Sequence, residues 1–240
     1  MEKLKAHVCF SPELIGAYGN DNSVVAVIDV FRATSSICTA IHYGAKEVIP
    51  VVNVTVARQY LDSGFIVGAE RGGEIIEGFE YGNSPFHFMD DKIKGKTIVL
   101  STTNGTNAIA AARIAYKVAI ASFLNLDSIS SWLLKQEREI VLLCAGWNNK
   151  FNMEDTLLAG AIVEKLQDSG KEFEWSDSAI AAVHLYKIAK KDLFGFLIHS
   201  SHRRRLARLN IEKDIAYCLT LNQTNVVPVL YAGSIINFNE

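Results

Sequence analysis

Cysteine is scarce in this sequence, and its spacing excludes the usual cysteine-based sites. The chain contains four cysteines among 240 residues, and no two of them form a Cys-x-x-Cys pair. They are Cys9, Cys38, Cys144 and Cys218. Structural zinc sites normally use such close pairs, so none is expected. Because three of the four lie inside apolar segments, we expect buried, reduced thiols, as is typical of a cytoplasmic protein.

Long apolar runs and an excess of charge are also missing. No stretch approaches the roughly 20 apolar residues that span a bilayer, and the first ten residues, MEKLKAHVCF, do not resemble a signal peptide. The formal net charge is −2, which does not favour nucleic acid or an anionic membrane as a partner. Apolar residues make up 49% and charged residues 21% of the chain, so we expect a soluble, globular protein.

Short β-branched runs alternate with helical patterns along most of the chain. The expected strands are 7–10, 24–30, 47–52, 65–69, 97–101, 117–121 and 140–144. The expected helices are 34–42, 54–62, 106–114, 126–136 and 154–168, with Asn53 and Asn125 as plausible caps of two of them. Several strands are continuously apolar, as in sheets that are covered on both faces. The pattern predicts an α/β fold with a mostly parallel mixed sheet flanked by helices.

The last third of the chain has a different pattern. It is mainly helical over 175–222, contains a basic stretch at 202–208, and ends with an expected strand at 226–231. We therefore divide the chain into an α/β core, 1–170, and a mainly helical part, 171–240, which either stands apart or covers the same sheet. The basic stretch is interpreted as a solvated helix face or a subunit contact, with a lid over a site as the alternative.

Polar residues gather at the ends of four expected strands, where open α/β sheets bind ligands. The first group is Asp29 and Arg32, followed by the start of a helix. A carboxylate in an apolar strand needs a cation or hydrogen-bond donors, which a metal ion or Arg32 can supply. The free amides of the helix can hold an anion. The alternative is a structural ion pair that only caps the helix.

The second group combines charge with glycine. Glu70 and Arg71 precede a glycine pair that begins at Gly72, and such a pair lets a backbone approach a ligand closely. The segment Tyr81–Pro85 follows, with Asn83 and Ser84 as its small polar members. Both segments can equally be ordinary turns.

The third group is a loop of small polar residues between an expected strand and an alanine-rich helix. Its members are Thr102, Thr103, Asn104, Gly105 and Thr106. Such loops form backbone nests that hold phosphate. The loop lacks the Gly-Lys-Ser/Thr ending of a P-loop and is not a Gly-x-Gly-x-x-Gly loop, and a plain turn is the alternative.

The fourth group is Glu154 and Asp155, which open the helix after the strand at 140–144. Acids in a first helical turn commonly complement the helix dipole. Taken with Asp29 and Glu70, however, they make a set of oxygen ligands without cysteine or histidine, which favours Mg²⁺ over zinc. Arginines suit phosphate, sulfonate or carboxylate groups. The sequence therefore predicts a magnesium site for a small substrate with several negative charges.

Common phosphatase chemistries are excluded by simple spacings. Phe31 stands where a haloacid-dehalogenase site needs its second aspartate, and Lys150 stands where a cysteine phosphatase needs arginine after Cys144. No Arg-His-Gly triplet occurs. Of the six histidines, only His199 and His202 are three residues apart, and no carboxylate lies near them in the sequence. We therefore interpret the histidines as structural or surface groups.

Five segments, in this order, resemble the 2-phosphosulfolactate phosphatase family. They are IDVFRATSSI, GAERGG, YGNSP, STTNGT and the AG…F-x-x-ED…AGA stretch, and the resemblance covers about residues 7–230. It implies an α/β fold specific to the family and an Mg²⁺-dependent hydrolase of the coenzyme M pathway. The implied reaction converts 2-phosphosulfolactate to sulfolactate and phosphate.

The resemblance also assigns roles to residues. The implied catalytic set is Asp29, Arg32, Glu70 and Glu154. The implied metal ligands are Asp29, Glu70 and Glu154 or Asp155. The implied substrate-binding set is Arg71, Gly72, Asn83, Ser84 and the loop Thr102–Thr106, with Arg32 also on phosphate. Either Asp29 attacks phosphorus, or Mg²⁺ activates a water with an acid as general base.

Two other functions fit the same motifs. One is a phosphatase of another phosphorylated hydroxy acid, because the motifs specify a phosphate and a nearby anion rather than a sulfonate. The other is a non-catalytic anion-binding protein, which would need the arginines and glycine loops but not the clustered acids. A homo-oligomer is expected, as for many enzymes of this class.

Overall fold

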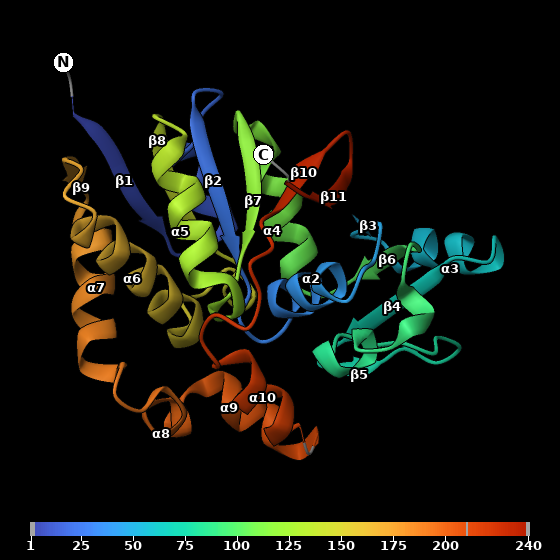
Figure 1. Ribbon diagram of the computed structural model, residues 1–240. Coiled ribbons are helices and arrows are strands. Elements are labelled where there is room, and N and C mark those ends of the chain that lie inside the picture. Colours follow the sequence, from blue (N-terminus) through green and yellow to red (C-terminus); the bar gives the residue numbers. More distant parts are fainter. Residues whose placement is uncertain (1–2, 210, 239–240) are drawn as a thin grey trace.

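One mixed β-sheet runs through the molecule (Figure 1). The computed structural model describes residues 3–209 and 211–238, and within them the sheet has eleven strands in the order β5-β4-β6-β3-β11-β10-β7-β2-β8-β1-β9. The strands are β1 Leu4–Cys9, β2 Ser23–Ile28, β3 Glu47–Pro50, β4 Ile66–Arg71, β5 Glu74–Ile75, β6 Thr97–Ser101, β7 Lys117–Ala121, β8 Glu139–Cys144, β9 Phe173–Trp175, β10 Pro228–Tyr231 and β11 Ser234–Asn237. The predicted α/β fold with a mostly parallel mixed sheet is confirmed.

Two parallel blocks make up most of this sheet. One is β9-β1-β8-β2-β7, and the other is β3-β6-β4. The hairpin of β10 and β11 lies between them and pairs antiparallel with β7 on one side and β3 on the other. Each of these outer pairings involves a single residue pair, Val229 with Ala119 and Ile235 with Val48. The hairpin is thus a narrow bridge between the two blocks.

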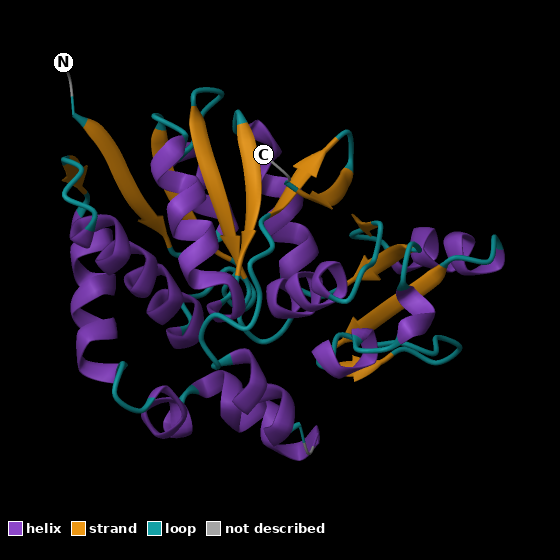
Figure 2. Ribbon diagram, viewed as in Figure 1, coloured by secondary structure: helices purple, strands orange, loops and turns teal. Residues whose placement is uncertain are grey.

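Helices cover both faces of the sheet (Figures 1 and 2). They are α1 Ile15–Tyr18, α2 Ala33–His42, α3 Val54–Asp62, α4 Gly105–Ala111, α5 Leu126–Lys135, α6 Met153–Asp168, α7 Asp177–Ala189, α8 Leu193–Phe196, α9 Ser201–Leu206 and α10 Glu212–Cys218. All six residues of β2 are buried. Its Ala26 packs into the core with α5, α6 and α7, whereas its Val25 packs into the core with α2 and α4. A strand covered on both faces has no polar side, which explains the continuously apolar sequence.

Most predicted elements match the structure closely. The helix at 54–62 has the predicted bounds, and the Asn53 side chain caps it by accepting a hydrogen bond from the Thr55 amide at 2.7 Å. Asn125 does not cap α5. It forms a capping box with Ser122 one turn earlier, so the chain turns into α5 through a short 3₁₀ helix.

The last third of the chain does more than cover the sheet. Besides α7 to α10, it contributes β9 at one end of the sheet and the β10–β11 hairpin near the middle. The sequence predicted β10 but neither β9 nor β11. α8, α9 and α10 lie below the carboxyl ends of β2 and β7 in Figure 1, and this placement brings the basic stretch at 202–208 close to the predicted site.

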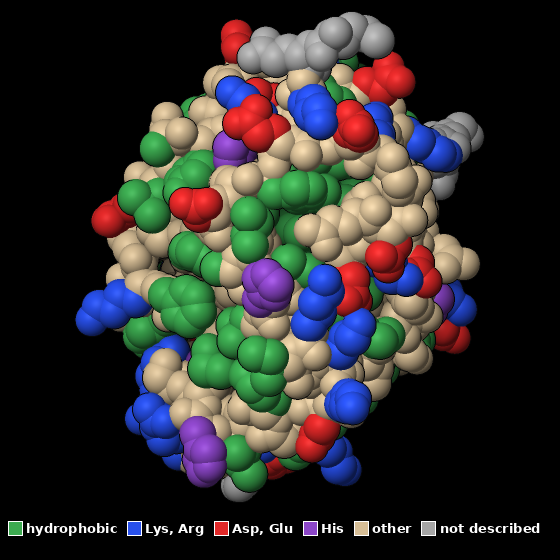
Figure 3. Space-filling view, turned by 90° about the vertical axis from the view of Figure 1, so that its left-hand side faces the viewer, with side chains coloured by type: hydrophobic (Ala, Val, Ile, Leu, Met, Phe, Trp, Pro, Cys, Tyr) green, Lys and Arg blue, Asp and Glu red, His purple; other side chains and the backbone are tan. Residues whose placement is uncertain are grey.

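Helices α6 and α7 pack tightly against each other at one side of the molecule. A Cβ atom added to Gly160 of α6 would lie 2.1 Å from the Ala182 carbonyl oxygen of α7. The outer face of α7 exposes apolar side chains, including Ile188, which is 71% exposed. Figure 3 shows this side of the molecule, where apolar side chains gather between charged ones. None of the helices in 3–209 and 211–238 has the length and apolar character that a membrane span requires.

Candidate active site

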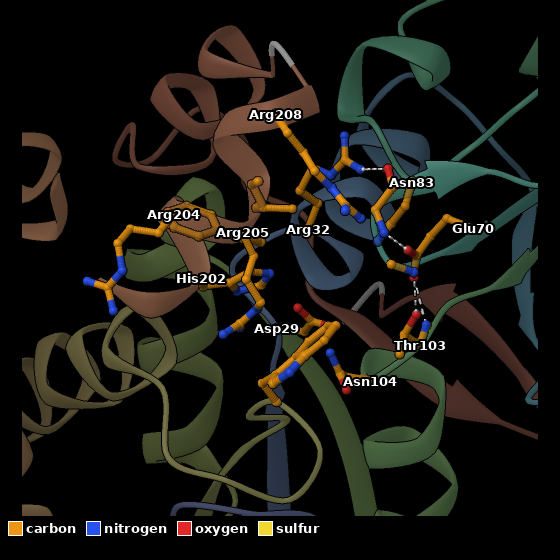
Figure 4. A pocket seen from close by; sticks show the side chains of 15 residues that line it. Asp29, Arg32, Glu70, Asn83, Thr103, Asn104, His202, Arg204, Arg205 and Arg208 are labelled. Carbon is orange, nitrogen blue, oxygen red and sulfur yellow. Dashed lines mark hydrogen bonds between the residues drawn. The ribbon is translucent and has the colours of Figure 1, made fainter. Parts of the chain in front are cut away.

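A cavity of about 310 Å³ lies where the predicted strand ends meet (Figure 4). Residues after β2, β4, β6 and β8 line one part of it, and residues of α9 and the turn that follows line the rest. The lining residues are Asp29, Phe31, Arg32, Glu70, Gly72, Gly73, Asn83, Thr103, Asn104, Trp147, His202, Arg204, Arg205, Leu206 and Arg208. The four strand ends singled out in the sequence therefore converge on one site.

Asp29 is the carboxylate that remains free in this cavity. Its side chain is 5% exposed, and no hydrogen bond to it occurs among the residues that the structure describes. Burial raises its pKa to about 7, helped by the charges of Glu70 and Glu154 and opposed by His202 and Arg32. A Cβ atom on Gly105 would lie 2.7 Å from Asp29 Oδ2, so glycine is needed for α4 to begin here.

Glu70 lines the cavity but already has two partners. Its Oε1 accepts a hydrogen bond from the Thr103 amide and its Oε2 one from the Gly73 amide, both at 2.7 Å. The carboxylate thus ties the turn after β4 to the loop after β6. A metal ion bound by Glu70, as expected from the sequence, would compete with these two hydrogen bonds, because each oxygen already accepts one from an amide.

Arg71 does not reach the cavity. Its guanidinium donates to the carbonyl oxygens of Glu70 and Val52 at 2.6 and 3.0 Å, and to the Ser101 hydroxyl at 3.3 Å. Successive side chains of a strand point to opposite faces, so Glu70 and Arg71 are directed apart. The arrangement gives Arg71 a structural role in place of the expected contact with phosphate.

Arg32 lines the cavity from its buried position after β2. Its Nη1 lies 2.5 Å from Asp214 Oδ2 of α10, and its Nη2 donates to the Gly73 carbonyl oxygen at 2.8 Å. Most of its charge is therefore balanced by Asp214, a partner that the sequence did not indicate. The ion pair fastens α10 to the carboxyl end of β2.

Glu154 and Asp155 are both fully buried at the start of α6. Asp155 accepts three hydrogen bonds, from the Val30 amide at 2.9 Å, the Gly146 amide at 3.1 Å and the Asn152 side chain at 3.0 Å. It joins the ends of β2 and β8 and is absent from the cavity wall. Both of its oxygens therefore already accept hydrogen bonds, from two backbone amides and the Asn152 side chain, and these bonds compete with the metal-binding role expected for it.

Glu154 has a different partner. Its Oε1 lies 2.5 Å from His202 Nδ1, and its Oε2 has no hydrogen-bond partner among the described residues. The sequence placed no carboxylate near His202, because the two residues are 48 positions apart. The interpretation of His202 as a structural or surface group must be corrected, since it lines the cavity.

Some residues of the loop at 102–106 line the cavity, and others stabilise the turn before α4. Thr103 and Asn104 line the cavity. Thr102 and Thr106 instead bind each other, through the Thr106 amide to Thr102 Oγ1 at 3.2 Å and the Thr106 hydroxyl to the Thr102 carbonyl oxygen at 2.9 Å. They hold the turn at the start of α4, which leaves the middle of the loop to meet a ligand.

The segment around Asn83 contributes one unpaired polar atom. Asn83 lines the cavity, and its Oδ1 is buried without a hydrogen-bond partner in the part of the chain that the structure describes. Ser84 caps the following 3₁₀ helix by accepting from the Phe86 amide at 3.3 Å, so it supports the turn and does not line the cavity. Gly72, for which substrate binding is expected, is part of the cavity wall.

The basic stretch at 202–208 forms much of the opposite wall. His202, Arg204, Arg205 and Arg208 all line the cavity, which differs from the solvated face or subunit contact expected. Arg203 points elsewhere and pairs with Glu212 at 3.0 Å. The three-residue spacing of 202 and 205, which puts both on one face of a helix, was the signal available in the sequence.

Arg205 is poised to bind an anion. Its guanidinium stacks over the Trp147 ring with 4.3 Å between the guanidinium carbon and the ring centroid. Its Nη1 donates to the Ser201 hydroxyl at 3.2 Å, but its Nε and Nη2 are buried and have no partner among the described residues. Buried donors without partners are costly, and an anionic group in the cavity would satisfy them.

The carboxylates fit a metal only in a limited way. No cluster of three or more His, Cys, Asp or Glu suited to holding a metal ion occurs within 3–209 and 211–238. Mg²⁺, however, is often held by one or two carboxylates, several waters and the substrate phosphate itself. Asp29 fits that mode, because its oxygens face the cavity and have no other partner.

Comparison with known proteins identifies relatives of this chain. The 2-phosphosulpholactate phosphatase profile matches residues 9–233. A protein of Caldanaerobacter subterraneus subsp. tengcongensis named probable 2-phosphosulfolactate phosphatase is 40% identical over 213 residues, covering 87% of this chain and 88% of its own. Same-named proteins of Thermotoga petrophila and Clostridium acetobutylicum are 42% and 35% identical, covering 88% and 90% of this chain and 90% and 92% of theirs.

The matched region contains all four strand ends and the part of α9 that faces them. It also contains the five segments on which the resemblance was based, and the resemblance is thereby confirmed. The chain belongs to the 2-phosphosulpholactate phosphatase family.

Proposed function

We propose that this protein hydrolyses 2-phosphosulfolactate to sulfolactate and phosphate in a Mg²⁺-dependent reaction. The observation that carries the proposal is the cavity at the four strand ends, which combines one free carboxylate with several guanidinium groups in a member of this family. Its volume of about 310 Å³ suits a small ester. A phosphate and a second acid group need several positive charges, and Arg205 and Arg208 offer them on one wall.

Each part of the substrate has a natural counterpart in the cavity. Asp29 would hold Mg²⁺, which, when bound, neutralises phosphate charge and lowers the pKa of a bound water. Thr103 and Asn104 lie at the start of α4, on the wall where an anionic phosphate can approach backbone amides. Arg205 would receive an acid group at its unpaired donors. The nucleophile is either the Asp29 carboxylate or a metal-activated water.

The cellular setting belongs to the same proposal. The family resemblance implies a step of the coenzyme M type, the reduced thiols favour a cytoplasmic location, and enzymes of this class are commonly homo-oligomers. Light scattering after size-exclusion chromatography measures the oligomeric state directly. Detection of sulfolactate that depends on this protein in its source organism would test the pathway.

The decisive experiment is a phosphate-release assay with matched substrates. 2-Phosphosulfolactate and 2-phospholactate differ in the sulfonate, so their kcat/KM values separate the proposed substrate from another phosphorylated hydroxy acid. We expect release from 2-phosphosulfolactate with Mg²⁺ and none with chelator. Equal rates on both esters would favour the broader hydroxy-acid phosphatase. Binding without release in the presence of Mg²⁺ would instead indicate an anion-binding protein.

A further inference from the structure

His202 is held in a fixed orientation at the cavity wall. Its Nδ1 lies 2.5 Å from Glu154 Oε1. The rings of Phe31 and Trp147 contact the imidazole, each with 5.9 Å between ring centroids. The side chains of His202 and Glu154 are 5% and 1% exposed. An imidazole fixed through Nδ1 presents its other nitrogen, Nε2, on the opposite edge of the ring, and His202 lines the cavity beside Asp29 (Figure 4).

The Glu154 carboxylate determines which nitrogen of His202 is available to a ligand. A buried carboxylate needs a positive partner. Glu154 Oε2 has no hydrogen-bond partner in the described residues, so His202 is the group that binds this carboxylate directly. The Arg205 guanidinium also attracts the Glu154 carboxylate, from a greater distance. This pairing engages Nδ1 with Glu154 and leaves Nε2 as the ring nitrogen that is available to a ligand.

We infer that His202 is the proton donor to the leaving oxygen of the substrate and that Glu154 is its positioning residue. This inference rests on the proposed phosphatase activity. As the nucleophile forms its bond to phosphorus, the bond between phosphorus and the ester oxygen breaks, and the electron pair stays on that oxygen. The oxygen takes the proton from His202 Nε2 and leaves as a neutral hydroxyl group. The water consumed in the hydrolysis returns a proton to His202.

The other cavity groups are poorly suited to this task. The oxygen of a secondary alcohol is a strongly basic leaving group, and a positioned acid accelerates such a step by about 10²–10⁴-fold. The arginines keep their protons, Glu70 accepts hydrogen bonds at both oxygens, and Asp29 is assigned to the metal or to phosphorus. His202 is the remaining group of the wall that belongs to a side-chain type commonly used for proton transfer.

The test compares substrates whose leaving groups differ in basicity. p-Nitrophenyl phosphate has a weakly basic leaving group that departs without a proton. The leaving oxygen of 2-phosphosulfolactate is strongly basic and needs a proton to depart. We expect His202→Asn to lower kcat/KM by about 10²–10⁴-fold on 2-phosphosulfolactate but by less than about tenfold on p-nitrophenyl phosphate. Glu154→Gln should show the same selectivity with a smaller loss. His199→Asn is the matched control, because His199 is exposed and outside the cavity wall.

Equal losses on the two substrates would overturn the inference, since a base, a nucleophile or a purely structural group affects both. The wild-type enzyme gives a second measurement that does not depend on a variant folding. Its kcat/KM over a series of aryl phosphates should vary only weakly with leaving-group basicity, and a steep dependence would contradict proton donation. If the wild-type enzyme hydrolysed no phosphate ester, the proposed function itself would fail.

Discussion

At the scale of single residues, the carboxylates of the site differ in the partners they already have. Glu70 and Asp155 accept backbone amides, and Glu154 binds His202. Asp29 has no such partner among the described residues. Since a free, partly charged carboxylate in a cavity is the one available for chemistry, substitution of Asp29 should affect turnover most directly.

We expect Asp29→Asn to lower turnover by at least about 10³-fold, because it removes the group assigned to the metal or to phosphorus. The variant should remain folded. The folded-state pKa of Asp29, about 7, exceeds its ordinary value of 3.8, so this residue makes the protein less stable as the pH rises from 3.8 to about 7. In urea unfolding with chelator at pH 8, the variant should be at least as stable as the wild type. Near-normal turnover would refute both roles given to Asp29.

The unpaired donors of Arg205 predict a loss of binding. Loss of one charged hydrogen bond, worth about 1.5–3 kcal/mol, should raise KM for 2-phosphosulfolactate in Arg205→Gln by about 10- to 150-fold. Arg205→Lys should recover only part of this loss, because lysine lacks the planar fork. Arg138→Gln is the control, because Arg138 packs on Tyr116 outside the cavity wall. An unchanged KM in Arg205→Gln would show that the substrate does not use these donors.

The sequence showed which strand ends carry the site but not how every side chain is directed. The position of Glu70 after an apolar strand was enough to predict that it lies at the site. The alternation of side chains in a strand would also have predicted that Arg71 points to the opposite face. His202 could not be placed in this way. Its pairing with Glu154 joins α9 to α6 across 48 residues, and such a contact depends on tertiary packing that no local pattern specifies.

At the scale of elements, the close contact of α6 and α7 depends on Gly160. A methyl group there would meet the Ala182 carbonyl oxygen at 2.1 Å. We expect Gly160→Ala to lower the free energy of unfolding by about 1–3 kcal/mol through overpacking, as measured by urea titration. Gly16→Ala is the control, because a Cβ atom at Gly16 of α1 has nothing within 4 Å. Equal stability of the two variants would show that the helices can separate without cost.

The elements themselves were largely predictable, and the exceptions have physical causes. Buried parallel strands are continuously apolar, so the apolar runs in the sequence predicted β2, β6, β7 and β8. β9 has only three residues, too few to show a period. β11 follows a two-residue turn, Ala232-Gly233, in which both residues have positive φ. Such turns join hairpin strands. They are usually recognised by Asn, Asp or Gly at the first position, and alanine stands there in this chain.

At the scale of the whole molecule, the four thiols report on the intact fold. All four cysteines are buried, and burial raises the pKa of Cys9 to about 11 and that of Cys218 to about 12. At pH 8 a thiol of pKa 11 has about 100-fold less thiolate than one of pKa 9. The native protein should therefore react with a disulfide reagent at least about 100-fold more slowly than the unfolded chain, which should show four thiols. Rapid reaction of one thiol in the native state would contradict its buried position.

The β10–β11 hairpin has a consequence for how the protein is made. Its residues, 228–237, are near the end of the chain, yet they bridge two blocks built from earlier residues. During synthesis, β7 and β3 each keep one unpaired edge until the residues of this hairpin have been added and have folded. Asp29 and Glu70 come from different blocks, so the sheet that aligns them is completed last. The two parts of the site therefore depend on residues 228–237 for their alignment, although none of these residues lines the cavity.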